Sequence, residues 1–341
     1  MPESYIVVVA MGSHASWYQT LSSEKRAAIK RLHKLETRWN LVAVAFVCAW
    51  WALAWAAVSV DNVFARIPAY LVIAILLSSI ANFMHEAAHG NVFRNRQADR
   101  LWGIVMGLPI LISFSAYQYS HQAHHRHNRT EKDPDEFFNI TSNRTLLSVL
   151  SVIWTFVGTF VYLLYLPGVA LVQGSARVRR AVALEYGLIV VFWTALWLAA
   201  VNAGVSAWLV HGWLIPVLCG SLWINMRYWA EHMLTDRGHP LRETRTVLSS
   251  KLFSFMNVHM NYHLDHHLFP GVPWYNLPRL HSLLEDEFRA AGSSVYRSYL
   301  RYFFDAFRKG IHGRAMGFHP TEESMITTAG RGSRASATDS R

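Results

Sequence analysis

The feature that most constrains this chain is a series of apolar blocks, each close to the length of a bilayer crossing. Four blocks are almost free of charged residues, and they cover residues 41–60, 67–84, 182–201 and 208–226. A helix needs roughly 20 apolar residues to cross the hydrocarbon core of a bilayer. A short polar turn at Asp61 and Asn62 joins the first two blocks, and a loop at residues 202–206 joins the last two. The sequence therefore predicts two transmembrane helical hairpins.

The composition agrees with a membrane protein. Hydrophobic residues make up 52% of the chain and charged residues only 16%, an apolar excess that ordinary soluble domains do not carry. The net charge of +10 would also suit a nucleic-acid-binding protein, but the cations gather between the apolar blocks, where anionic headgroups explain them. They include Lys25, Arg26, Lys30, Arg31, Lys34, Arg38, Arg177, Arg179 and Arg180. No nucleic-acid partner is expected. Cys48 and Cys219 lie inside apolar blocks, so no disulfide framework is expected.

Other segments are less regular. Residues 101–115 and 145–172 are apolar but broken by glycine and proline, so each could cross the membrane, re-enter it or lie in the interface. Residues 295–311 place aromatic and aliphatic side chains on one helical face, which predicts an amphipathic interfacial helix. The tail at 321–341 has few apolar residues and is predicted to be disordered.

Eight of the 18 histidines fall in three short clusters. The clusters are His85 and His89 in HEAAHG, His121, His124 and His125 in HQAHH, and His263, His266 and His267 in HLDHH. Residues three or four positions apart share a helix face, so each cluster aims its imidazoles at one point. Neutral imidazole suits iron, zinc or copper, and eight ligands exceed the three or four that one zinc ion uses. Two metal ions that share the clusters are therefore expected.

The positions of the clusters restrict the path of the chain through the membrane. The first cluster follows the block at 67–84 directly, and His232 follows the block at 208–226, so both hairpins return histidines to the same membrane face. The middle cluster can join them only if the stretch at 101–115 returns to the side it left. The stretch at 145–172 must likewise return to the side it left, because His232 has to reach the same face. Neither stretch is therefore expected to be a simple crossing.

The resulting prediction is an all-α integral membrane protein. It has four transmembrane helices in two hairpins, interfacial or re-entrant segments, and a helical cap that holds the metal site. Basic segments at 25–38 and 94–100 place this cap and both chain ends in the cytoplasm by the positive-inside rule. The chain then divides into a cytosolic N-terminal segment at 1–40, a membrane domain at 41–320 and the tail at 321–341.

Further motifs accompany the clusters and together resemble the membrane fatty acid desaturase family. They are DPD at 133–135, EH at 231–232, TRT at 244–246 and NYHLDHHLFPGVPWYNLPRLH at 261–281. The resemblance covers roughly residues 40–290, and the run HHLFPGVPWYNLPRLH is its most specific part.

The resemblance implies that the clustered histidines bind two iron ions, together with one histidine from the segment after the fourth span. His232 matches that position. The nine histidines that it implies as ligands are His85, His89, His121, His124, His125, His232, His263, His266 and His267. It further implies O2 as co-substrate, a lipid or acyl substrate from the bilayer, and a separate electron donor of the ferredoxin or cytochrome b5 type.

The implied reaction is the introduction of a double bond into a fatty acyl or lipid chain. A hydroxylase or ketolase that uses the same di-iron site on an apolar substrate is the alternative. The spacing of the first pair keeps it open, because His85 and His89 enclose three residues. Acyl-CoA desaturases have one residue more there, whereas other bacterial and hydroxylating members have three.

Several polar residues beside the clusters are candidates for supporting roles. His259 lies four residues before His263 and is expected on the same helical face, as an additional ligand or a hydrogen-bond donor. Metal-bound imidazoles usually donate their other N–H to an acceptor. The carboxylates that could accept it are Glu86, Asp133, Asp135, Glu231 and Asp265.

Two other classes of protein, a zinc metalloprotease and a metal transporter, also have histidines in or beside membrane spans. HEAAH at 85–89 also satisfies the zinc metalloprotease pattern HExxH, with Glu86 as general base, which would make the chain an intramembrane protease. That interpretation leaves the histidines outside the motif without a role. A metal transporter would carry its ligands within the spans, whereas here they lie just outside them. Metal analysis distinguishes the di-iron enzyme from the zinc protease, because about two iron ions per chain are expected for the first and one zinc ion for the second.

Overall fold

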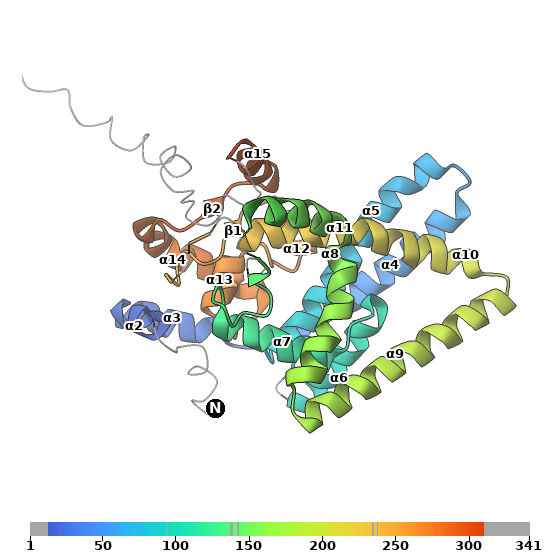
Figure 1. Ribbon diagram of the computed structural model, residues 1–341, viewed down its shortest axis with the longest axis horizontal. Helices are drawn as coiled ribbons and strands as arrows, with labels where there is room; N and C mark the ends of the chain where they lie inside the picture. Colours follow the sequence, from blue (N-terminus) through green and yellow to red (C-terminus); the bar gives the residue numbers. More distant parts are fainter. Residues whose placement is uncertain are drawn as a thin grey trace, which may run out of the picture.

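The computed structural model describes residues 13–309, except Arg94, Phe137, Phe138, Ser142, Leu234 and Arg237. The predicted disordered tail therefore lies outside the described residues. The described chain is largely helical, and its long helices extend away from a cap of short helices (Figure 1). The turn between α4 and α5 and the turn between α9 and α10 lie at the end opposite α2 and α3 (Figure 1).

The first hairpin consists of α4, Leu41–Ser59, and α5, Val63–Ala88. The side-chain oxygen of Asn62 caps α5 by accepting from the backbone N–H of Phe64 at 2.9 Å. Large apolar side chains of α4, including Trp55, are exposed, as expected for a helix that faces lipid. Helix α5 extends past the predicted apolar block, so the first histidine cluster forms its last turn.

The second hairpin consists of α9, Ala176–Asn202, and a returning path of α10, Ser206–Leu209, a π-helical turn, Val210–Leu214, and α11, Ile215–His232. The indole N–H of Trp50 on α4 donates to the Gly212 carbonyl in the π-turn at 2.6 Å, which satisfies a backbone acceptor inside an apolar layer. Helices α5 and α11 also pack together closely at Gly220, where a Cβ would lie 3.3 Å from a carbonyl oxygen of α5. The two hairpins thus form one packed bundle.

The first ambiguous stretch folds into a bent pair of helices. Helix α6, Arg96–Gly107, continues into a short 3-10 turn, η2, Leu108–Ile110, and α7, Phe114–His127, leaves at an angle of 102°. Gly103 permits the close approach of the two helices, because a Cβ there would lie 2.2 Å from the Phe114 ring. A bend of this size agrees with the expectation that residues 101–115 do not form a simple crossing.

The second ambiguous stretch forms a single helix, α8, Arg144–Gln173. In the described part of the chain, five helices are long and apolar enough to cross a membrane. They are α4, α5, α8, α9 and the α10–α11 path. The contacts of α8 hold it beside α7, since the Tyr165 hydroxyl donates at 2.9 Å to the Pro134 carbonyl in the loop after α7. Ala170 also packs with Ala116 of α7. The four-crossing topology therefore stays a prediction that depends on α8.

The cap contains the remaining elements. They are α2, Ser13–Thr20, α3, Ser23–Leu32, η1, Thr37–Asn40, β1, Thr246–Val247, α12, Lys251–Met256, α13, His263–Leu268, η5, Trp274–Asn276, α14, Leu277–Ala291, β2, Val295–Tyr296, and α15, Tyr299–Lys309. Strands β1 and β2 pair in parallel, which the all-α prediction did not include. The predicted helix at 295–311 accordingly starts later, at Tyr299, because its first residues belong to β2. Residues 310 and 311 lie outside the described part of the chain.

Cysteine labelling tests the threading of α8. In a chain without its two native cysteines, we expect a cysteine at Ser175, between α8 and α9, to be labelled from the same membrane side as one at Asn128, after α7. Cysteines at Asp61 and Gly204, in the hairpin turns, should be labelled from the other side. If Ser175 is labelled together with Asp61, then α8 crosses the membrane and the four-crossing topology is wrong.

Candidate metal centre

Five histidines from three helices form a first group of converging side chains. They are His85 and His89 at the end of α5, His121 and His125 on α7, and His266 on α13. One ring nitrogen of each lies within 4.8 Å of the corresponding nitrogens of the others. These residues are up to 181 positions apart in the sequence, since 266 − 85 = 181, so the arrangement is a product of tertiary packing.

The nitrogen separations in the first group match those of ligands on one metal ion. The Nε2 atom of His121 lies 2.9 Å from that of His89 and 3.0 Å from that of His125. The Nε2 atom of His266 lies 3.1 Å from that of His125. Two imidazoles bound at about 2.1 Å and at right angles place their nitrogens about 3 Å apart. These Nε2–Nε2 distances are therefore the ones expected for imidazoles that share one metal ion.

Four other histidines form a second group beside the first. His124 on α7, His232 at the end of α11 and His267 on α13 have ring nitrogens within 4.8 Å of one another. The Nε2 atom of His263 lies 2.8 Å from that of His232 and 3.1 Å from that of His267. The rings of His125 and His267 stack with centroids 4.3 Å apart, so the two groups adjoin. All nine histidines predicted from the sequence are thus placed together.

Helical periodicity explains how the second and third clusters serve both groups. On α7, His121 and His125 are four residues apart and point to the first group, whereas His124 points to the second. On α13 the assignment is reversed, because the two histidines four residues apart belong to the second group and His266 belongs to the first. At about 100° per residue, positions i and i+4 nearly coincide and position i+3 lies about 60° to the other side. The HxxHH pattern therefore divides its ligands between two metal positions.

Burial keeps the α13 imidazoles in the form that binds metals. Burial lowers the pKa of His263, His266 and His267 well below the ordinary histidine value, and nearby cationic or imidazole groups lower it further. At neutral pH these rings are therefore uncharged and carry a free lone pair, as a metal ligand must.

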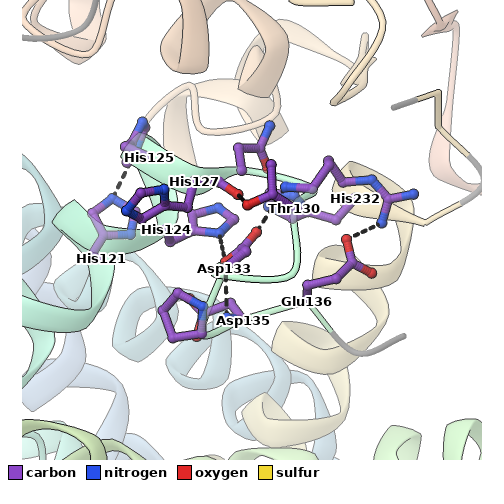
Figure 2. A network of polar contacts seen from close by, with 12 residues as sticks. His121, His124, His125, His127, Thr130, Asp133, Asp135, Glu136 and His232 are labelled. Atoms are coloured by element: carbon purple, nitrogen blue, oxygen red, sulfur yellow. Dashed lines mark hydrogen bonds and ion pairs between the residues drawn. The ribbon is translucent and has the colours of Figure 1, made fainter. Parts of the chain in front are cut away.

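Asp133 orients one of these rings. Its Oδ1 atom lies 2.8 Å from Nδ1 of His124 (Figure 2), which leaves Nε2 of His124 to face the second group. The same carboxylate accepts from the backbone N–H of Arg129 at 3.0 Å and of Asp135 at 2.9 Å. Asp133 thus supports a histidine as expected. Asp135 contributes a backbone N–H to Asp133 rather than a carboxylate to an imidazole.

The other candidate carboxylates have different partners. Glu86 and Glu231 lie 3.6 Å from Nδ1 of His85 and His263 respectively, a separation within range of an ion pair but too long for a hydrogen bond. Asp265 accepts instead from the Thr246 hydroxyl at 2.9 Å. Its second partner is His281, a histidine outside both groups.

His281 on α14 is the second partner of Asp265. Its Nδ1 atom lies 3.0 Å from the carboxylate. Burial lowers the pKa of His281, but the Asp265 charge and hydrogen bond raise it more, so the pKa is raised overall. This contact ties α14 to the ligand-bearing helix α13.

The expectation that His259 shares a helical face with His263 is wrong. Helix α13 begins at His263, and the backbone at His259 is left-handed with φ of 50°. Its Nδ1 atom lies 3.2 Å from the Trp274 carbonyl, and His259 belongs to neither histidine group among the described residues. The Trp274 N–H in turn donates to Glu86 at 2.9 Å, so Trp274 and Glu86 lie between His259 and His85 of the first group.

Glu185 was not predicted to contribute to the site. This buried carboxylate on α9 accepts from the hydroxyl of Ser113 at 2.7 Å and from the hydroxyl and backbone N–H of Ser115 at 2.6 and 2.8 Å. Arg100 on α6 donates to it at 3.1 Å. The carboxylate thereby holds the start of the helix that carries HQAHH at the α6–α7 bend. The signal in the sequence is a lone glutamate inside an apolar block, which is costly unless it is paired.

These features define a class of protein: an integral membrane protein of long apolar helices with two adjoining groups of buried histidines that could hold metal ions. Comparison with protein families finds that residues 61–299 match the fatty acid desaturase family. The chain belongs to the fatty acid desaturase family. Comparison with curated proteins found no match for this chain.

Replacement of Asp133 by Asn tests its role. An asparagine amide in place of one carboxylate oxygen would face a backbone N–H, and the His124 ring would lose its charged acceptor. We expect metal affinity of the second group to fall about 10- to 100-fold. Titration with Fe2+ under anaerobic conditions measures it, with Glu131→Gln in the same loop as the exposed control. Equal Fe2+ affinity in the Asp133 variant and the wild type would show that Asp133 does not support metal binding through His124.

Replacement of Glu185 by Ala tests the anchor of α7. The change leaves buried hydroxyl and N–H donors without their acceptor, so we expect a loss of about 2–3 kcal/mol in stability. Glu185→Gln keeps one acceptor oxygen and should lose less. Thermal unfolding in detergent measures both variants. Loss of stability in the Gln variant equal to that in the Ala variant would show that the hydrogen bonds to the carboxylate oxygens do not hold α7.

Proposed function

We propose that this protein is an O2-dependent di-iron oxidoreductase that introduces a double bond into a fatty acyl or lipid chain. The observation that carries the proposal is the convergence of nine histidines, seven buried and two half-buried, on two adjoining points at the ends of apolar helices. Membership of the fatty acid desaturase family supports the same chemistry.

The residues present fit two iron ions. The donor set is imidazole nitrogen, which iron accepts readily, and the two groups supply five and four rings. Both ring nitrogens of His85 are buried and have no hydrogen-bond partner in the described part of the chain, a cost that metal binding would remove at one of them. When bound, reduced iron supplies the oxidising power of O2 that an unactivated C–H bond requires.

The protein's own residues prepare this site in two ways. Burial keeps the α13 imidazoles neutral and excludes bulk water, which would otherwise compete for the metal positions. Asp133 fixes the tautomer and orientation of His124, so that Nε2 of this ring keeps its lone pair toward the second group. On α7, the Tyr117 ring stacks on His121 with centroids 5.0 Å apart, which restricts rotation of that imidazole.

The location of the site suits an apolar substrate. His85 lies in the last turn of α5 and His232 in the last turn of α11, both of which are candidate membrane spans. The metal positions would therefore lie at the boundary of the bilayer, where an acyl chain can reach them without passing through water. We propose four crossings with the cap and both chain ends in the cytoplasm, which the contacts of α8 with α7 and with the loop after it, together with the basic segments, support.

The geometry does not favour the zinc protease interpretation of HEAAH. A general base must face the water on the metal, but Glu86 accepts from the Trp274 backbone N–H at 2.9 Å and approaches the Nδ1 side of its neighbour His85. His85 and His89 also belong to the five-histidine group rather than to a three-ligand zinc site. Hydroxylation or ketone formation at the same site is distinguished by the product.

Metal analysis tests the di-iron site. We expect about two iron ions per purified chain and little zinc. His266→Ala should deplete the first group and His124→Ala the second, because each removes one ligand and leaves a vacant position. His127→Ala, on the same helix as His124 but outside both groups, is the matched control. A His266 or His124 variant with full iron content would contradict the assignment.

Product analysis tests the reaction. Expression in a host that lacks unsaturated fatty acids should yield a new double bond that depends on O2 and on a reductant. In desaturation both oxygen atoms leave as water, so the lipid product should contain no label from 18O2. Label in a hydroxyl or keto group of the product would establish the hydroxylase or ketolase alternative instead.

A further inference from the structure

Helix α3 carries a stripe of positive charge that the proposed function has not used. Lys30 and Arg31 are exposed on its last turn and Lys34 is exposed two residues after its end, and none forms an ion pair with another residue among those described. The opposite side is docked on the cap, since Ile29 is 1% exposed and Lys25 pairs with Glu287 of α14 at 2.6 Å. The charged side chains are therefore exposed to solvent, while the opposite side of α3 is packed against the cap.

A cluster of half-buried aromatic side chains adjoins this stripe. Trp17 and Tyr18 of α2 contact the Phe269 ring with centroids 6.2 and 5.9 Å apart. The His33 ring, which lies between the two lysines in sequence, contacts the same Phe269 ring at 6.4 Å. A partly apolar centre with a charged rim is the usual composition of a protein–protein interface. We call Trp17, Tyr18, Lys30, Arg31, Lys34 and Phe269 the α3 surface.

The α3 surface lies directly over the segment that follows the last histidine cluster. Phe269 is two residues after His267 of the second group. The chain after α3 is also bonded to this segment, because the Asn276 side chain donates to the Leu32 carbonyl at 2.8 Å and the rings of Trp39 and Tyr275 stack at 5.3 Å. A partner on the α3 surface would therefore reach the metal centre through few covalent and van der Waals contacts.

The position of α3 disfavours lipid headgroups as the ligand of this stripe. Helices α2 and α3 lie at the end of the long axis opposite the turns of both hairpins (Figure 1). Arg177 and Arg180, by contrast, lie at the start of α9, next to exposed apolar residues of α8, where headgroups are the natural partner. Glu36 pairs with Arg38, and Glu285 of α14 pairs with Arg289. Glu24 on α3 and Asp286 on the packed helix α14 are also exposed, and these two carboxylates leave the three cations of the stripe with a net positive charge.

The proposed reaction requires electrons from outside the chain. Conversion of R–CH2–CH2–R′ and O2 into R–CH=CH–R′ and two waters consumes two further electrons and two protons. On this proposed function we infer that the α3 surface is the docking site of a small acidic one-electron carrier protein. Opposite charge steers such a partner to the surface, and the aromatic cluster supplies the buried centre of the contact.

Binding of a carrier tests this inference independently of catalysis. The probe is an oxidised acidic plant-type 2Fe–2S ferredoxin, and the protein is held in nanodiscs of zwitterionic phosphatidylcholine. Lys30→Gln/Lys34→Gln should raise the Kd about 10-fold or more at low ionic strength and weaken its salt dependence. Arg177→Gln/Arg180→Gln removes the same charge from the membrane side and should leave the Kd unchanged.

Other outcomes overturn the docking site. Absence of wild-type binding to the ferredoxin at low ionic strength, or equal loss in both double variants, would exclude it. Loss of binding to phosphatidylserine vesicles in the Lys30/Lys34 variant, with an unchanged ferredoxin Kd, would assign the stripe to headgroups. A single turnover with dithionite, lipid and O2 separates this inference from the proposed function, because product should form in every variant without a carrier.

Discussion

Convergence of imidazole rings is the constraint on which the arrangement of the chain depends. Nitrogens that lie 2.8–3.1 Å apart in buried groups have repelling lone pairs unless a cation or a proton lies between them. The helices that carry them must therefore be held by other contacts with little freedom. This requirement explains why α5 and α11 pack closely and why the α6–α7 bend is sharp.

Buried polar contacts away from the histidines supply much of this rigidity. Glu185 holds the start of α7. At the end of α11, the buried Arg245 donates to the carbonyls of Ala230 and Met233 at 2.5 and 2.9 Å and lies 4.5 Å from the Tyr302 ring. These contacts fix the start of the helix that carries the second histidine cluster and the end of the helix that carries His232. A buried charge is tolerated there because its hydrogen bonds are made.

The sequence predicted the local part of this arrangement and missed the long-range part. Ligand spacing identified eight of the nine histidines that converge, because positions i, i+3 and i+4 constrain a helix whatever surrounds it, and the family resemblance added His232. The same reasoning placed His259 on the helix of His263, and failed because the left-handed turn at residues 258–259 is set by packing. The acceptor role of Glu185 depends on serines about 70 positions away, and no local pattern records such a pair. The two-residue strands were missed for the same reason.

The division of ligands within HxxHH has a consequence for cooperativity between the metal positions. Helix α7 contributes to both groups, and so does α13, so neither group can be moved without the other. A shift of α7 that separates His121 from the first group also withdraws His124 from the second. The stacked rings of His125 and His267 couple the groups across the two helices. In the proposed di-iron site, occupation of one group would order helices that the other group needs, so two ions should bind with positive cooperativity.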